Sequence, residues 1–557
     1  MFNRVAILVL ITGIAIFFYG AVVKLHVPLV EWEGRYISAA EQVVHGQRSL
    51  LPGENPPLYI WYLAFWFKLF GVDPAIGRIA NIFALSLTTL IIFFTTKSIS
   101  NKACGYFAAA AYLLNPAVIQ GSALMDLADT SLLPLIFILL VWAIVKDSQG
   151  RSPRFSTLFI ALTVAFCFWL KITSALALMV SICLGLFLTR LRQNAPRIIK
   201  GIISGSAVFL ISWIVISLMI WNKKVTLEIL AAPFMSFRGV AFEGSLMNRM
   251  LSFVLNSLRI IFWLSPFAIF ACLSIWKLSW QRSDNKGYLL NFLGWVSFIY
   301  FFSYLIVGGA SWGFPRYYAA ILPLFAVLIG IFAEEVFAKF SRRAVFIFFT
   351  LVIGLLIIYL FLLSDPVFLL TLGFKKAVLS GFVGLFIKHF VSEGFLYIML
   401  PFLALVLFRR DFRDENFIYK IMVILYIGII VSHLSLDIKQ ARASFGTSYE
   451  YGTQGRSDVI AFVLRQIEKK DTVMATSGLL YELREKDVPP VGCDVWYSEE
   501  RVLKFLQESK PKVVIIGLTT HTVRELQGIR NHAKINAILT SEYTQYSIGT
   551  YRVWVRK

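Results

Sequence analysis

The most informative stretch of this chain is Leu25–Arg78, which reads LHVPLVEWEGRYISAAEQVVHGQRSLLPGENPPLYIWYLAFWFKLFGVDPAIGR. It follows the first apolar run that is long enough to cross a bilayer. Carboxylates and arginines, Glu33, Glu54 and Arg78 among them, stand here between apolar segments. Charge near hydrocarbon is costly and is usually kept for function. We therefore expect this stretch to contain a functional site.

The composition shows which solvent surrounds that stretch. Of the 557 residues, 58% are hydrophobic and only 15% are charged, against about 25% charged residues in soluble domains. Apolar runs of bilayer-spanning length recur over the first 435 residues. The sequence therefore predicts a polytopic α-helical membrane protein with about thirteen transmembrane helices, at 5–23, 76–96, 103–120, 129–146, 155–170, 172–189, 201–221, 259–277, 288–308, 317–338, 344–363, 393–408 and 417–435.

The net charge of +21 follows the membrane topology. With the N-terminus inside, every short inside loop is basic, as the positive-inside rule requires. These loops also suit anionic lipid headgroups, so we do not expect nucleic acid as a partner. The basic residues are Lys97, Lys102, Lys146, Arg151, Arg154, Arg190, Arg192, Arg197, Lys200, Lys277, Arg282, Lys286, Lys339, Arg342, Arg343, Arg409, Arg410 and Arg413.

This orientation divides the chain into a transmembrane domain, 1–435, and an extracytoplasmic α/β domain, 436–557. Within the first part, the long outer loops are 24–75, 222–258 and 364–392. Within the second, 458–469 and 498–509 have helical periodicity, and 472–476 reads as a short strand. The β-branched run 512–517 predicts a buried parallel strand, and 546–555 predicts a final edge strand. Without a glycine-rich phosphate loop, the domain reads as a docking or lid domain.

The cysteines predict no disulfide framework. Cys104, Cys167, Cys183 and Cys272 lie in or beside apolar runs, where a thiol behaves as a small hydrophobe. Only Cys493 is expected in the outer compartment, without an obvious partner. The first apolar run lacks a small-residue cleavage site, so we expect it to be retained as a transmembrane helix.

The first outer loop contains two candidate carboxylates before a short amphipathic helix at 37–44. Glu31 and Glu33 flank Trp32, and Tyr36 suits the membrane interface. A carboxylate held in a cleft here can act as a general base toward a hydroxyl or amine. The alternative is an ion pair between Glu33 and Arg35 on a hydrated loop.

A rigid turn follows in Glu54-Asn55-Pro56-Pro57. Two prolines fix the backbone and push the residue before them toward extended geometry. Such a turn can hold Glu54 at a set depth. Alternatively, it simply ends the loop before an interfacial helix at 58–70.

Two further places are polar at the outer ends of predicted transmembrane helices. Asp126 and Asp129 are three residues apart and would share a helical face, although Asp129 is better explained as an N-cap. Arg316, followed by Tyr317, enters a transmembrane helix from outside. Its guanidinium suits a lipid phosphate, or it serves as an interfacial anchor.

In the order of these motifs the chain resembles the GT-C membrane glycosyltransferases, above all the protein mannosyltransferase/aminoarabinose transferase superfamily. The motifs are Glu33-Gly34-Arg35-Tyr36, Gly53-Glu54-Asn55-Pro56-Pro57-Leu58, Leu69-Phe70-Gly71, Arg78, Asp126 and Arg316-Tyr317. The resemblance covers the whole membrane region. It implies the GT-C fold for a transmembrane catalytic domain, 1–435. It also implies transfer of a sugar, with inversion, from a polyprenyl-phosphate carrier to a lipid, glycan or protein acceptor on the extracytoplasmic face of a bacterial inner membrane.

The resemblance also implies roles for single residues. Glu33 matches the second acid of the family's Asp-Glu pair, and Trp32 replaces the first, which is the usual catalytic acid. Glu31 or Glu33 must then supply that function, or the chain has lost activity. Asp126 matches the family's acid after the third transmembrane helix and is the other candidate catalytic carboxylate. Glu54 matches an acidic position implicated in metal binding, so a divalent metal ion is a further expectation.

Catalysis would depend on positioning and on stabilising the departing lipid phosphate. The candidates for binding the substrates are Tyr36, Asn55, Arg78, Lys171, Arg316 and Tyr317. Two other classes compete with this interpretation. A polysaccharide polymerase or lipid-linked sugar flippase would share the basic loops but would not need the outer carboxylates in this order. A transporter would place polar residues near the midplane of the membrane.

Overall fold

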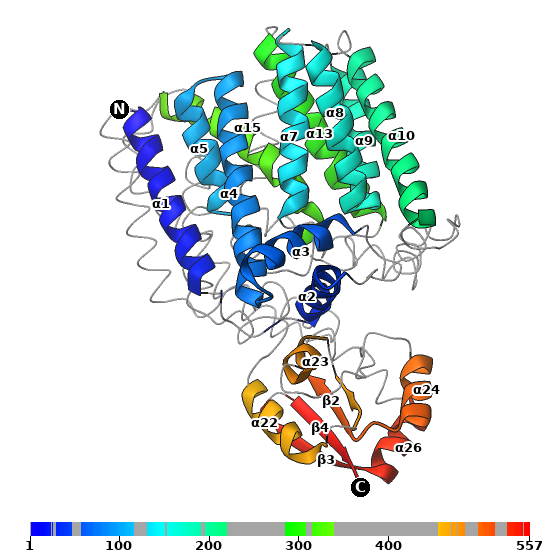
Figure 1. Cartoon of the computed structure of the whole chain (residues 1–557). Coiled ribbons are helices and arrows are strands. Elements are labelled where there is room, and N and C mark those ends of the chain that lie inside the picture. Colours follow the sequence, from blue (N-terminus) through cyan, green and yellow to red (C-terminus); the bar gives the residue numbers. More distant parts are fainter. Residues whose placement is uncertain are drawn as a thin grey trace.

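The computed structural model describes residues 2–23, 25, 29, 31–46, 57–115, 118, 131–150, 153–189, 191, 195–219, 285–307, 315–338, 455–468, 471–475, 477–484, 499–517, 532–549 and 551–557. They form a bundle of apolar helices and, beyond one end of it, a smaller α/β unit (Figure 1).

The bundle contains α1 (Phe2–Val23), α4 (Pro74–Ile99), α5 (Lys102–Leu113), α7 (Leu132–Ser148), α8 (Pro153–Leu170), α9 (Ile172–Leu188), α10 (Ala195–Met219), α13 (Asn285–Val307) and α15 (Leu322–Ala338). The 3-10 helix η2 (Pro315–Ile321) precedes α15. By length and composition, 3 described helices can cross a membrane, over Asn3–Val22, Pro74–Ile99 and Ala195–Met219. The predicted transmembrane helices at 259–277, 344–363, 393–408 and 417–435 lie outside the described residues, as do the loops 222–258 and 364–392.

Hydropathy located most of these helices to within a few residues, with one correction. The helix predicted at 103–120 ends at Leu113, close before Asn115-Pro116. The residue before a proline disfavours helical geometry, so the apolar composition extends further along the chain than the helix does.

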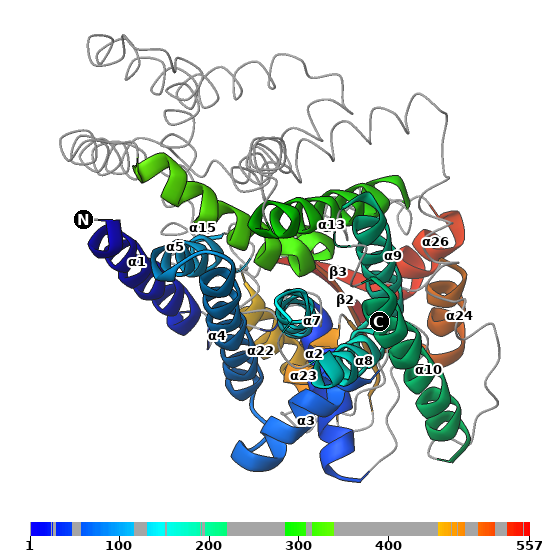
Figure 2. The same ribbon diagram turned by 90° about the horizontal axis from the view of Figure 1, so that it is seen from above.

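The bundle is built around α7, which Figure 2 shows end-on, with α4, α8 and α13 around it. Helix α1 lies on one flank and α10 on the other. The outer helices expose large apolar side chains, such as Leu8, Ile203 and Ile211. Exposed apolar surface of this kind needs a hydrocarbon solvent, and the protein is accordingly an integral membrane protein.

The helix ends that adjoin the predicted basic loops lie together at one end of the bundle. The Gln149 side chain donates to the Ser98 carbonyl at 2.8 Å, and Lys286 Nζ donates to Ser100 Oγ at 2.6 Å. These contacts join the ends of α4 and α7 to the start of α13. They lie at the opposite end from α2 and α3 (Figure 1), as the charge pattern predicts.

Two short helices cover that other end. Helix α2 (Glu31–Val44) starts earlier than the amphipathic segment predicted at 37–44, and α3 (Leu58–Phe70) has the predicted bounds. Helix α3 begins directly after Pro57 and stops at Gly71, whose φ of 95° favours glycine. Both helices lie across the ends of the long helices (Figure 1).

The α/β unit contains a sheet with strand order β1-β2-β4-β3. Its strands are β1 (Val473–Met474), β2 (Val513–Gly517), β3 (Tyr543–Ile548) and β4 (Tyr551–Arg556), and its helices are α22 (Arg456–Gln466), α23 (Ser477–Arg484), α24 (Glu499–Ser509) and α26 (Ala533–Glu542). Strand β2 pairs in parallel with β1, as predicted, and antiparallel with β4.

Both faces of this sheet are apolar. Val513, Ile515 and Val553 pack with α22 and α23, whereas Val514 and Trp554 pack with α24 and α26. Strands that are buried on both faces have continuous apolar sequences and no alternation of apolar and polar residues. The run at 512–517 has such a sequence.

The predicted single edge strand at 546–555 is wrong. The segment is a hairpin of β3 and β4, because Gly549, with φ 56°, lets the chain turn between Ile548 and Tyr551. Strand β4 lies inside the sheet, and β3 is its edge. Helices α23 and α26 were not predicted from sequence.

Candidate functional site

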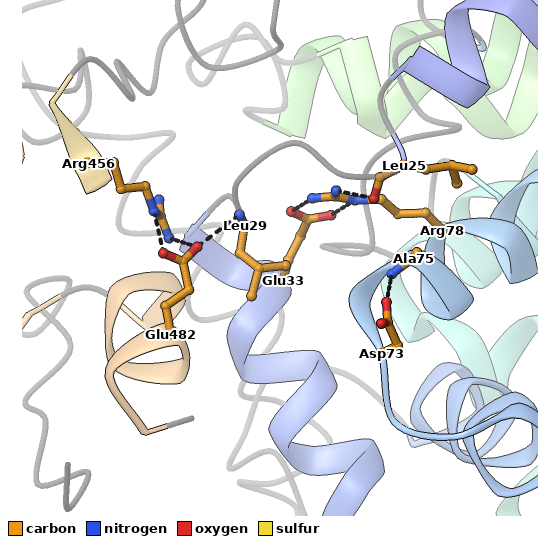
Figure 3. Close-up of polar contacts among 8 residues, drawn as sticks. All are labelled: Leu25, Leu29, Glu33, Asp73, Ala75, Arg78, Arg456 and Glu482. Atoms are coloured by element: carbon orange, nitrogen blue, oxygen red, sulfur yellow. Dashed lines mark hydrogen bonds and ion pairs between the residues drawn. The ribbon is translucent and has the colours of Figure 1, made fainter. Parts of the chain in front are cut away.

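A buried ion pair joins the first outer loop to the first turns of α4. Arg78 Nη2 lies 2.9 Å from Glu33 Oε2, and Arg78 Nε donates to Glu33 Oε1 at 3.3 Å. Both side chains are almost fully buried, at 1% and 0% exposed. Figure 3 shows the guanidinium facing the carboxylate edge-on. Glu33 and Arg78 therefore form one buried ion pair, which holds α2 against α4.

Local sequence places each partner. Asp73 caps α4 by accepting from the Ala75 N–H at 2.6 Å, and Pro74 occupies the first turn. Arg78 then lies one turn into α4. It also donates through Nη1 to the Leu25 carbonyl at 2.9 Å, so it holds the chain just after α1 as well as α2.

The charge pair continues into a buried polar network. Asn81, three residues after Arg78, shares its helical face. The Asn81 side-chain oxygen accepts from the Tyr59 hydroxyl at 2.9 Å and from Ser131 Oγ at 3.0 Å. The Tyr59 ring meets Tyr36 edge-on, with centroids 5.5 Å apart. The network thus joins α2, α3, α4 and the start of α7.

Sequence reasoning singled out Glu33, Tyr36 and Arg78 in this network but missed Tyr59, Asn81 and Ser131. An asparagine in an apolar helix, one turn after an arginine, was the available signal for Asn81. Ser131 closely follows the stretch that contains Asp126.

A second polar group lies around Lys171, between α8 and α9. The Lys171 side chain is buried. Nearby along α9, the Ser174 hydroxyl is 2.5 Å from the Tyr304 hydroxyl. Tyr304 in turn contacts the ring of Tyr318, with centroids 6.1 Å apart. Tyr318 lies two residues after Arg316 in η2.

The Lys171 group and the Glu33–Arg78 pair share one end of the bundle. Trp169, two residues before Lys171, contacts Trp61 of α3 with ring centroids 5.6 Å apart. Helix α3 therefore covers the end of α8 as well as the start of α4. The polar groups lie at the end of the bundle that the two short helices cover (Figure 1).

Several predicted site residues cannot be placed in this arrangement. Glu54, Asn55 and Asp126 lie outside the described residues. Glu31, Arg316 and Tyr317 belong to described helices, but their side chains lie outside the described part. The same holds for Arg35, the predicted ion-pair partner of Glu33, and the partner that the structure gives Glu33 is Arg78. Among the described residues, no group of three His, Cys, Asp or Glu side chains could hold a metal ion.

The sequence comparisons point to one family. Residues 54–221 match the model of the dolichyl-phosphate-mannose-protein mannosyltransferase family. This range contains the Pro-Pro turn, Arg78, Asp126 and Lys171. No curated protein sequence matches the chain significantly.

The structural comparisons extend the likeness to nearly the whole chain. ArnT from Cupriavidus metallidurans, bound to undecaprenyl phosphate, is similar with a TM-score of 0.58 and 13% identity, over 98% of this chain and 97% of that one. Its apo state gives a TM-score of 0.56 and 13% identity, over 99% and 97%. An archaeal oligosaccharyltransferase, AglB from Archaeoglobus fulgidus, gives 0.47 and 10%, over 98% and 74%.

Proposed function

We propose that this protein, whose fold is similar to that of ArnT and whose residues 54–221 match a mannosyltransferase family model, is a membrane glycosyltransferase. It transfers a sugar from a polyprenyl-phosphate carrier to an acceptor at the membrane face covered by α2 and α3. The observation that carries the proposal is the buried Glu33–Arg78 unit, which lies at that face beneath the first-loop helices. The likeness to an ArnT bound to undecaprenyl phosphate supports the class of carrier.

The reaction needs three things from the protein. The bond between the sugar carbon and the phosphate oxygen breaks, and the carrier phosphate leaves with the electron pair. A bond forms from the acceptor heteroatom to the same carbon, with inversion, and the acceptor proton passes to a carboxylate. Catalysis therefore depends on a proton acceptor, on positioning and on cations beside the phosphate.

We assign Glu33 to positioning. Both of its oxygens face the Arg78 guanidinium, and the side chain has no exposed surface. An acceptor would reach this carboxylate only after the pair had opened, which is costly for a buried charge. Glu33 instead fixes α2, and with α2 the buried Tyr36 ring, against α4.

We assign the role of proton acceptor to Asp126. It lies five residues before Ser131, whose hydroxyl is bonded to Asn81. The proposal requires the Asp126 carboxylate to reach an acceptor held beside this polar network. Glu31, at the start of α2, is the second candidate.

We assign the carrier phosphate to Arg316, with Lys171 beside it. Arg316 belongs to η2, and Tyr318 of the same helix touches the group around Tyr304. Tyr317 and Asn55 remain candidates for the sugar or the acceptor. A divalent ion at Glu54 is a separate expectation, and no step here depends on it.

The test of the phosphate site is Arg316→Ala. Loss of a charge-assisted contact removes about 1.5–3 kcal/mol, so the affinity for undecaprenyl phosphate, measured by native mass spectrometry, should fall tenfold or more. Arg316→Lys should restore it only in part, because the planar fork is lost. Unchanged binding by the alanine variant would make Arg316 an interfacial anchor.

The proposed setting is a bacterial inner membrane, with the site and the α/β unit outside. Arg192 and Arg342 should then be cytoplasmic and Cys493 extracytoplasmic. A membrane-impermeant thiol reagent should label Cys493 in intact cells, with a Cys493→Ser variant as the control. Labelling that appears only after lysis would reverse the orientation.

A further inference from the structure

Among the described residues, the short helix α23 of the α/β unit packs against α2 of the candidate site. Tyr481 of α23 is 6% exposed and belongs to the hydrophobic cluster that also contains Tyr36, Ile37 and Ala40 of α2. Helix α2 is therefore packed between α3, which belongs to the helical bundle part, and α23, which belongs to the α/β unit. The α/β unit therefore packs directly against the helix that carries Glu33.

Next to Tyr481, Glu482 makes an ion pair within the α/β unit. Arg456, at the start of α22, places Nη2 2.8 Å from Glu482 Oε1 and donates from Nε to Oε2 at 3.1 Å. The side chains are 8% and 22% exposed. One hydrogen bond and one ion-pair contact thus hold the Glu482 carboxylate toward Arg456.

The fixed carboxylate also reaches the other part of the protein. Glu482 Oε1 accepts a long hydrogen bond, 3.4 Å, from the Leu29 backbone N–H. Leu29 is buried and lies two residues before α2 begins. Figure 3 shows Glu482 between Arg456 on one side and Leu29 on the other.

These contacts alternate along the chain that leads from α1 into α2. Arg78 holds the Leu25 carbonyl, Glu482 holds the Leu29 N–H, and Arg78 again holds the Glu33 carboxylate. The spacing is four residues each time. The backbone approach to α2 is thus tied alternately to the bundle and to the α/β unit.

We propose that Glu482 is a positioning residue for the candidate site: oriented by Arg456, it holds the chain at Leu29 so that Glu33 meets Arg78. The α/β unit then contributes to transfer without contacting the substrates. The effect on turnover rests on the proposed function, whereas the effect on the backbone of the first loop does not.

The experiment combines hydrogen exchange with turnover on the full-length protein in detergent. In Glu482→Ala, the amides of a peptide that covers residues 25–33 should exchange about tenfold faster or more, because local opening becomes easier. The kcat for sugar transfer should fall about tenfold, with the KM for the lipid-linked sugar extracted from native membranes little changed. Glu482→Gln keeps an acceptor oxygen for Leu29 and should restore much of both.

The matched control is Glu508→Ala. Glu508 pairs with Lys504 on α24 at 3.8 Å, in the same unit, and both side chains are exposed. Its loss should change neither exchange at 25–33 nor kcat.

A double variant that exchanges the two charges distinguishes the positioning of Leu29 from the stability of the α/β unit. The double variant Arg456→Glu/Glu482→Arg restores an ion pair but turns a guanidinium, which cannot accept a hydrogen bond, toward Leu29. The α/β unit should regain its unfolding temperature, while exchange at 25–33 stays fast and kcat stays low. Recovery of kcat in the double variant would overturn the inference.

The failures are distinguishable. Unchanged exchange at 25–33 in Glu482→Ala would overturn the positioning contact, whatever the turnover. Faster exchange in a protein whose wild type transfers no sugar would support the contact and refute the proposed function.

Discussion

Replacing Glu33 with glutamine is expected to lower turnover by about a hundredfold and to destabilise the fold. The amide would present a donor to the Arg78 guanidinium and leave a buried charge without its counter-ion. Breaking such a pair costs about 3–5 kcal/mol, and a shift of α2 by about 1 Å is enough for the loss of turnover. Thermal unfolding and the rate of sugar transfer measure the two effects.

The double variant Glu33→Gln/Arg78→Gln separates these effects. It removes both charges, so most of the stability should return while turnover stays low. Glu41→Gln, on the same helix in a weak pair with the exposed His45, is the matched control and should leave both quantities near wild type. A stable Glu33→Gln variant with full turnover would remove Glu33 from the site. If Glu31→Gln then abolished turnover, the motif would be aligned two residues out of register.

Replacing Asp126 with asparagine is expected to lower turnover by about a hundredfold or more, because the variant lacks the proton acceptor. Asparagine has nearly the same shape, so the unfolding temperature and the binding of undecaprenyl phosphate should be unchanged. Single-turnover kinetics with the lipid-linked sugar measure the chemical step directly.

Asp129→Asn is the control for this variant. Asp129 is expected to cap the helix that follows, and asparagine is an equally good cap, so turnover should stay near wild type. If Asp126→Asn transferred sugar at the wild-type rate, the assignment of the base to Asp126 would be wrong. Glu31→Gln, expected to have a milder effect, would then be the variant to examine.

Much of the bundle could be predicted because bilayer-spanning helices need only length and hydropathy. Helices α4 and α9 match their predicted ranges closely for this reason. The helix at 103–120 was predicted too long because apolar composition continues past the point at which Asn115-Pro116 ends it. In the α/β unit, alternation through 546–555 concealed the turn at Gly549.

The sequence singled out Glu33 and Arg78 but not the contact between them. It offered Arg35 as an alternative ion-pair partner of Glu33 and listed Arg78 among the substrate-binding candidates. The observed partners lie 45 residues apart, and no local periodicity reports such a contact. The same holds for Glu482, which meets Leu29 across 453 residues.

The central claim is that the protein consumes a polyprenyl-phosphate sugar. The most direct test adds the purified protein to liposomes that contain the lipid-linked sugars extracted from native membranes, with an acceptor fraction from the same cells. Mass spectrometry then follows the ratio of polyprenyl-phosphate sugar to free polyprenyl phosphate. We expect the wild type to convert the first into the second with time and Asp126→Asn to leave the ratio unchanged. A ratio that stays constant with the wild-type protein would contradict the account.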